Sequence, residues 1–316
     1  MNKKAKYRIR NWKNYNRSLV QRGSITIWFS EDAVAKWLAE REEGRKGHPL
    51  IYSDTAILTA LMIRSVFHLP LRALQGFLTS LVLLMNIDLP IPNYTRICRR
   101  AKSLGQGLKK LSKRTVTDLV IDSTGLKVYG EGEWKVRQHG YCKRRTWRKV
   151  HLAVCPDSNE IIFEILTENT VGDCEVYPEF LEAAPETVER CYGDGAYDTE
   201  GCYKASSNHG SELITPPQRN AAFRQNAPAH MEDRNKAYLE VLGLGGDEEA
   251  RKLWKKLKGY HRRSLAETAM FRFKQLFGNN LRSRCFRNQQ AEVYAKSLAL
   301  NTMTRLGMPQ SERIAA

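Results

Sequence analysis

The chain has 316 residues, with 51 Lys and Arg against 34 Asp and Glu, so its formal net charge is +17. This excess of positive charge favours nucleic acid as a partner, although charge alone is also typical of other basic proteins. A secretory signal and a membrane span are not expected, because the basic N-terminus precedes no apolar stretch and the most apolar segment, 77–91, is short and interrupted by polar residues.

The cysteines and histidines argue against two further classes of site. The seven Cys residues form no CxxC pair and are odd in number, and the seven His residues are scattered. We therefore expect reduced thiols in a cytoplasmic protein, with neither a disulfide framework nor a Cys or His metal site.

The first 22 residues hold eight Lys or Arg and no acid, with Tyr7, Trp12 and Tyr15 interleaved. This composition predicts a basic arm that runs along phosphates, and a disordered solubilising tail is the alternative. Residues 23–114 follow as a helical region, which is expected to bind DNA. The periodicity predicts helices over 55–67, 71–85 and 94–104, with a break at Pro70.

The third of these helices is basic and carries Arg96, Arg99 and Arg100. Short helices with tight breaks are typical of a helix-turn-helix-like reader of DNA. An ordinary helical bundle packed on a catalytic core would show the same pattern, so both interpretations stay open.

From residue 115 the pattern changes to that of a mixed α/β (α+β) domain. Three successive strands, then helix, strand, helix and strand, describe a ribonuclease-H-like mixed β-sheet. Asp122 lies on the first strand and Asp194 at the end of the fourth, so the two would be adjacent if these strands pair. The predicted strands are 118–129, 149–155, 160–166, 188–192 and 212–215, and the predicted helices are 174–184 and a short one after Asp198.

A second basic cluster lies just downstream of Asp122 and includes three aromatic residues. Its position beside the predicted site favours a grip on DNA over a generic charged hairpin. The basic members are Lys135, Arg137, Lys143, Arg144, Arg145, Arg148 and Lys149.

Residues 217–259 are predicted to be an insertion with helical content at 234–242 and 248–257. One interpretation is that the insertion reaches over the active cleft or contacts DNA. The alternative is that it is a surface segment without such a role. Helical periodicity returns over 289–306, and residues 309–316 are expected to be a flexible tail.

Between these two segments, Tyr260, Arg263, Glu267 and Lys274 recur at helical spacings and fall within a sector of roughly 60°. The pattern predicts one helix that packs an apolar stripe inward and presents these four side chains together. For an isolated helix, a solvated charged face is the alternative.

Asp122, Asp194 and Glu267 are the candidate catalytic residues and metal ligands. Mg²⁺ and Mn²⁺ prefer carboxylate oxygen, so three carboxylates could hold two ions, a pair suited to phosphodiester chemistry. Arg263 and Lys274 are assigned to the DNA backbone, because cations beside the metal ions would be repelled, and Tyr260 on the same face is also expected to contact DNA. Asp118 and Asp198 are weaker candidates, the first toward the other end of its strand and the second as a helix N-cap.

Three motifs resemble those of the DDE transposases of bacterial insertion sequences. They are Ile121-Asp122-Ser123-Thr124-Gly125, Gly193-Asp194-Gly195-Ala196-Tyr197-Asp198, and the spacing of Tyr260, Arg263, Glu267 and Lys274. Segment 53–84 further resembles the insertion-sequence five family, and the likeness covers most of residues 20–308. The resemblance implies a ribonuclease-H-like catalytic core with a helical N-terminal region.

The resemblance implies a catalytic domain over 115–308 that depends on Mg²⁺, with Mn²⁺ as a substitute. It also implies binding of terminal inverted repeats by the N-terminal region, assembly of a homo-oligomer on two DNA ends, and joining of 3′-hydroxyl ends to target DNA. The expected location is the bacterial nucleoid. A DNA-binding repressor or domesticated protein without chemistry, and a nuclease that only hydrolyses, are the alternatives.

Overall fold

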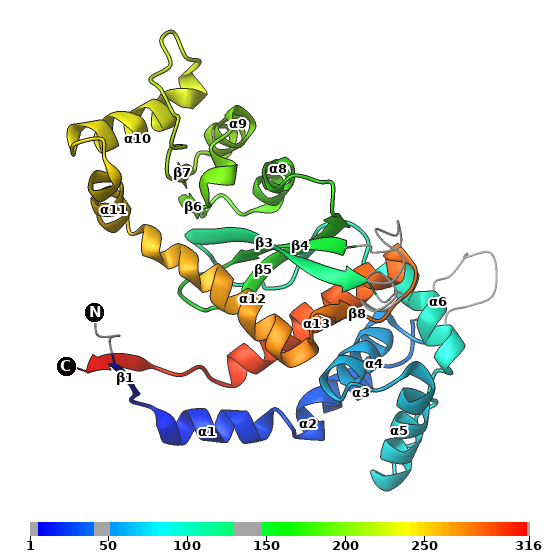
Figure 1. The fold of residues 1–316 in the computed structure, drawn as a ribbon. Helices are drawn as coiled ribbons and strands as arrows, with labels where there is room; N and C mark the ends of the chain where they lie inside the picture. Colours follow the sequence, from blue (N-terminus) through cyan, green and yellow to red (C-terminus); the bar gives the residue numbers. More distant parts are fainter. Residues whose placement is uncertain (1–5, 41–50, 129–146, 315–316) are drawn as a thin grey trace, which may run out of the picture. The chain divides into compact units, whose positions relative to one another are not determined.

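The computed structural model describes residues 6–40, 51–128 and 147–314 (Figure 1). The chain divides into two compact units, which we call the terminal unit (Met1–Leu104 with Leu298–Ala316) and the central unit (Gly105–Ser297). The division precedes the predicted boundary between residues 114 and 115, because Lys109 and Lys110 pair with a strand of the central sheet.

The central unit is built on a seven-stranded mixed sheet with the order β2-β5-β4-β3-β6-β7, and β8 pairs with β3 off this path. β2 is antiparallel to β5, β5 to β4 and β4 to β3, whereas β6 and β8 are parallel to β3, and β7 is parallel to β6. This is the ribonuclease-H-like arrangement that the sequence predicts. The strands are β2 (Lys109–Lys110), β3 (Asp118–Val128), β4 (Trp147–Val154), β5 (Ile161–Glu168), β6 (Arg190–Tyr192), β7 (Glu212–Ile214) and β8 (Asn280–Leu281).

Strand β3 buries both faces, and its side chains alternate between two apolar clusters. Leu119 and Ile121 join the cluster that includes residues of α8 (Asp173–Ala183) and α9 (Glu200–His209). Val120 joins the cluster that includes residues of three later helices, α10 (Glu232–Gly243), α11 (Glu248–Leu257) and α12 (Ser264–Phe277). Because successive side chains of a strand point to opposite faces, Asp122 lies on the Val120 face and Ser123 on the Ile121 face.

The predicted helices of the insertion are present. The short 3₁₀ helix η2 (Ala229–Met231) leads into α10 (Glu232–Gly243), and α11 (Glu248–Leu257) follows. Trp254 is buried and its Nε1 donates to Glu240 Oε2 at 2.8 Å, which joins the two helices. The 3₁₀ helix η3 (Tyr260–Arg263) and α12 (Ser264–Phe277) come next, and α13 (Phe286–Leu306) crosses from the central to the terminal unit.

The terminal unit holds the three predicted helices, α4 (Asp54–Val66), α5 (Leu71–Leu84) and α6 (Tyr94–Leu104). Ser53 caps α4 by accepting a hydrogen bond from the backbone of Ala56 at 3.1 Å. The unit also contains α1 (Trp12–Gln21), α2 (Ile25–Trp28) and α3 (Glu31–Ala35). Among the described residues, no single helix is long and apolar enough to cross a membrane, and α4 and α5 reach that composition only as a pair bent by 109°.

Both ends of the described chain contain regular secondary structure. Within the predicted basic arm, residues 6–9 form β1 (Lys6–Ile9) and residues 12–21 form α1, and the predicted flexible tail contains β9 (Ser311–Ile314), which pairs antiparallel with β1. Asn11 ties the two ends together, because its Nδ2 donates to Met308 O at 3.0 Å and its Oδ1 accepts from Gln310 N at 2.8 Å. Local composition does not predict a pairing between residues nearly 300 positions apart.

Candidate active site

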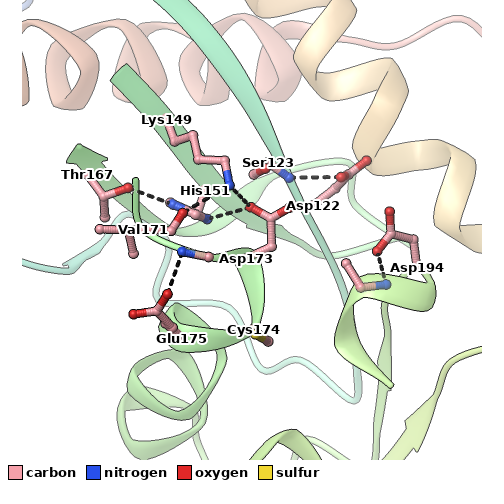
Figure 2. A network of polar contacts seen from close by, with 12 residues as sticks. Asp122, Ser123, Lys149, His151, Thr167, Val171, Asp173, Cys174, Glu175 and Asp194 are labelled. Carbon is pink, nitrogen blue, oxygen red and sulfur yellow. Dashed lines mark hydrogen bonds and ion pairs between the residues drawn. The ribbon is translucent and has the colours of Figure 1, made fainter. Parts of the chain in front are cut away.

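The two aspartates come together where β6 ends beside the middle of β3. β3 and β6 are parallel neighbours, with Val120 opposite Tyr192, so Asp122 and Asp194 each lie two residues beyond this pair. The sequence predicted that Asp122 and Asp194 would be adjacent if their strands pair. The strands do pair, so the two residues are neighbours. Figure 2 shows the two carboxylates on neighbouring segments of the unit.

Backbone groups orient both side chains. The amide of Ser123 donates to Asp122 Oδ1 at 2.8 Å, and the amide of Ala196 donates to Asp194 Oδ1 at 2.9 Å (Figure 2). Gly193 precedes Asp194 for a steric reason, since an added Cβ would lie 2.7 Å from the ring of Tyr197. Close packing of this buried ring thus fixes the turn that carries Asp194.

Glu267 enters the site from the first turn of α12. This helix buries Ala266, Ala269 and Phe273 while Glu267 stays exposed, as the predicted apolar stripe requires. The predicted single helix is wrong in one respect. Tyr260 and Arg263 belong to the preceding 3₁₀ helix η3, so the α-helix begins only at Ser264.

The guanidinium of Arg263 contacts all three carboxylates. Its Nη1 lies 2.6 Å from Glu267 Oε1, and its Nη2 lies 3.2 Å from Asp122 Oδ2 and 3.8 Å from Asp194 Oδ2. The sequence assigned Arg263 to DNA phosphate on the argument that cations avoid the metal site. Instead, the structure places it among the acids, where it reduces their mutual repulsion.

The electrostatics of the site follow from this arrangement. Burial raises the pKa of Asp122; the Ser123 hydrogen bond and the Arg263 charge oppose the shift, while the charges of Asp194 and Glu267 add to it. Burial alone would lower the pKa of Arg263, but its acidic neighbours raise it, Asp122 first. The site therefore holds three acids that compete for one positive charge.

Lys274 and Tyr260 flank the triad. Lys274 Nζ donates to Thr124 Oγ1 at 2.5 Å, one pleat beyond Asp122 on the same face of β3, and burial lowers the pKa of this lysine. Burial likewise raises the pKa of Tyr260 to about 12, and Lys255 lies over its ring. Tyr260 thus lies near enough to the carboxylates to be affected by their charges, and Lys274 lies one pleat from Asp122 along β3.

Asp118 and Asp198, the weaker candidates, are paired with protein groups. Asp118 is buried and accepts from Arg190 Nε at 2.8 Å and from Arg262. Asp198 accepts from the Gln218 amide at 2.9 Å, and its other oxygen accepts from the Tyr203 hydroxyl. The predicted N-cap role of Asp198 is wrong, because Thr199 holds the N-cap position of α9.

The remaining predicted DNA-binding residues divide into three groups. Arg144 and Arg145 lie outside the described residues. Arg148 bonds Glu168 and Gln289 and stacks on Phe286, and Lys149 is paired with Asp173 at 2.9 Å. These internal contacts favour structural roles for Arg148 and Lys149.

On α6 of the terminal unit, Arg100 bonds Asp54 and the carbonyl of Tyr52, and Arg96 stacks on the ring of Tyr52. Arg96 and Arg99 are exposed. Exposed Arg96 and Arg99 are therefore the better placed of the three predicted residues to meet phosphate.

Sequence reasoning missed two groups that surround the site. Arg262 joins Asp118 to Asp157 and so fastens η3 to the sheet. Asp173 pairs with Lys149 on the opposite face of β3 from Asp122 (Figure 2). The only local signal for Asp173 is an acid in the first turn of a helix, a common stabilising position that suggests no connection to a distant strand.

Comparison with protein families agrees with this geometry. Residues 115–302, more than half of the chain, match a family model described as Transposase DDE domain, and residues 20–131 match a second model with the same description. The chain belongs to the DDE transposase family. Asp122, Asp194 and Glu267 of this transposase all lie within the longer match, and family membership implies DNA cleavage and transposition.

Proposed function

We propose that this transposase cuts DNA at the ends of an insertion sequence and joins the freed 3′-hydroxyls to target DNA. One observation carries the proposal: Asp122, Asp194 and Glu267, from three distant segments, converge on the single guanidinium of Arg263. Residues that only stabilise a fold are rarely arranged as three acids that repel one another, so this cluster points to a functional site.

The donor set suits divalent ions. Among the described residues, no group of three His, Cys, Asp or Glu side chains forms a ready-made metal site, and the acids share Arg263 instead. Their oxygens are nevertheless the hard donors that Mg²⁺ and Mn²⁺ prefer, and they already face one positive charge. Two such ions, when bound, would activate the attacking water or 3′-hydroxyl and stabilise the leaving oxygen.

The protein's own groups would bind and orient the DNA. Arg263 compensates the acids in the free protein, and a bound ion would relieve it of that role and leave the guanidinium to contact phosphate. Lys274 and Tyr260 border the same acids and are assigned to the DNA backbone. Positioning and charge stabilisation then serve both steps without a covalent protein intermediate.

The terminal unit is proposed to bind the terminal inverted repeats, as its likeness to the insertion-sequence five family suggests. Exposed Arg96 and Arg99 on α6 support this assignment. The protein would then act as a homo-oligomer on two DNA ends at the nucleoid. Its net charge of +17 supports association with DNA.

The test is a gel assay with Mg²⁺, a labelled duplex that ends in the element's own terminal repeat, and an unlabelled target plasmid. Joined product from the wild type, absent from a Glu267→Gln variant that still binds the end, supports the proposal. Cleavage without joining by the wild type would instead indicate a nuclease. Binding alone, with pre-cleaved ends and Mn²⁺ also tried, would indicate a DNA-binding protein without chemistry.

A further inference from the structure

The 3₁₀ helix η3 carries two consecutive arginines, Arg262 and Arg263, that contact different acids of β3. Arg263 contacts Asp122, the fifth residue of the strand, whereas Arg262 contacts Asp118, the first. Because strand side chains alternate and each residue rises about 3.3 Å, these two acids share one face and lie about 13 Å apart along the strand. η3 itself packs against β3 and β6. Two neighbouring residues of η3 therefore reach two separate positions on one face of the sheet.

Apolar packing holds α12 firmly but gives η3 less support. None of the four side chains of η3, all of which the structure describes, is fully buried, and Tyr260 packs against its apolar cluster while only partly buried. In contrast, α12 buries Ala266, Ala269 and Phe273. Packing of its own helix therefore positions Glu267, whereas Arg263 belongs to a short segment that needs a further anchor.

Arg262 supplies that anchor. Its Nη1 donates to Asp118 Oδ2, and its Nη2 donates to Asp157 Oδ1 in the turn between β4 and β5. The side chain of Asp118 is only 1 % exposed, so its position is fixed by the sheet around it. The side chain of Asp157 is 61 % exposed, and an ion pair in such a setting contributes little. The contact with Asp118 is therefore the one that fastens η3.

Asp118 has a second cationic partner, which makes the anchor experimentally separable from the fold. Arg190 Nε lies 2.8 Å from Asp118 Oδ1, and Arg190 Nη2 lies 3.1 Å from Asp118 Oδ2. Arg190 belongs to β6 and is the direct partner of Asp118 in the strand register. Breaking a buried ion pair is most damaging when it leaves a charge uncompensated. Because Arg190 still compensates Asp118 when Arg262 is replaced, the variant is expected to fold.

We propose that Arg262 is a positioning residue that holds Arg263 against the three carboxylates by anchoring η3 to Asp118. The inference rests on the proposed function, in which Arg263 passes from the acids to DNA phosphate. Because the two arginines are consecutive, a displacement of one moves the backbone of the other. A misplacement of about 1 Å can cost about 100-fold in rate. The alternatives are that Arg262 only stabilises the fold, or that it contacts DNA phosphate itself.

Variants of the full chain separate these roles. Arg262→Gln removes the anchor, Asp118→Asn weakens it from the other side, and Arg262→Lys keeps a positive charge at the same position. Arg190→Gln is the matched control, because it takes the other cation from the same carboxylate but lies on β6 and not on η3. Melting temperatures and gel-shift binding of the DNA end establish that each protein is folded and binds.

The first readout is single-turnover cleavage, measured as the rate at saturating DNA and the DNA concentration that gives half of it. We expect Arg262→Gln to lower the saturated rate about 10- to 100-fold and to leave half-saturation within about threefold. Asp118→Asn should act in the same direction, Arg262→Lys should recover part of the rate, and Arg190→Gln should stay within about threefold of the wild type. Adding Arg262→Gln to Arg263→Gln should slow cleavage no further, since Arg262 acts through Arg263.

The second readout is amide hydrogen exchange over residues 260–264 without DNA, which reports how firmly η3 is held. We expect exchange there to be about tenfold faster in Arg262→Gln than in the wild type, and unchanged within about twofold in Arg190→Gln. This measurement is independent of cleavage. A wild type that never cuts DNA counts against the proposed function, and hydrogen exchange then still decides whether Arg262 anchors η3.

Three outcomes would overturn the inference. The first is an equal saturated rate in folded Arg262→Gln and wild type. The second is a loss in Arg190→Gln that matches the loss in Arg262→Gln, because it would assign the effect to compensation of Asp118 and so to the fold. The third is weaker half-saturation with an unchanged saturated rate, which would assign Arg262 to phosphate contact.

Discussion

The two faces of β3 carry acids in opposite electrostatic situations. At the Asp122 face, three carboxylates share the guanidinium of Arg263, and at the Ser123 face one carboxylate, Asp173, is matched by Lys149. An acid and a base that neutralise each other have no remaining charge to attract an ion. A surplus of negative charge, in contrast, can be neutralised by a bound cation. Charge balance, and not the presence of acids, separates scaffold from site in this unit.

The largest expected effect comes from neutralising two acids that follow β6, one that shares Arg263 with other acids and one that is paired with protein groups. Asp194→Asn removes one of the three carboxylates that share Arg263. It should lower DNA cleavage at least about 1000-fold, a loss of about 4 kcal/mol in transition-state stabilisation. Asp198→Asn removes a buried, paired acid and should lower stability by about 1–3 kcal/mol while cleavage per folded molecule persists. Cleavage assays and urea denaturation measure the two effects.

The same two variants can also contradict the assignment of Asp194 to catalysis and Asp198 to the fold. Equal loss of cleavage in two proteins with native melting curves would remove the distinction between Asp194 and Asp198. Asp198 would then have to be counted among the catalytic acids.

A second comparison concerns a buried acid whose negative charge would be only weakly compensated by a neighbouring positive charge. Glu164 of β5 is buried and pairs in register with Leu152, itself opposite Asp122, and burial raises the pKa of Glu164 to about 8 against the opposing charge of Lys109. A folded-state pKa above the unfolded value of an acid means that the folded protein holds the proton more tightly. Stability should therefore fall as pH rises from about 4.5 to about 8.

Glu164→Gln should remove that pH dependence, because the amide stays neutral throughout. The variant should gain on the order of a few kcal/mol relative to the wild type between pH 5 and pH 8. Urea denaturation at both pH values measures the difference, and Glu179→Gln on the exposed side of α8 is the control. Parallel pH profiles for wild type and Glu164→Gln would show that Glu164 is ionised in the folded protein.

The smallest expected effect comes from removing the shared cation. Arg263→Gln should lower stability in the absence of metal by about 1 kcal/mol, because Arg263 is only partly buried and the acids are partly solvated. The rise in melting temperature on adding Mg²⁺ should be larger in the variant, since an ion would no longer compete with the guanidinium. An identical rise in both proteins would show that Arg263 does not share the metal-binding position.

Much of the architecture was accessible from local sequence patterns. Short apolar runs bounded by turn residues predicted the central strands, and helical periodicity predicted α4, α5, α6, α10 and α11. The motifs around Asp122, Asp194 and Glu267 suggested the family that the comparison then showed. These features depend on residues that are close together in the chain.

Contacts between distant residues decided the rest. The parallel pairing of β3 with β6 made Asp122 and Asp194 neighbours, and the same folding placed Arg263 among the acids instead of beside phosphate. Pairing across the fold also assigned Lys149 to Asp173. A charged residue has the same sequence signature whether it faces solvent, a partner or a ligand, so only the tertiary structure determines which charges are already balanced and which remain to bind something else.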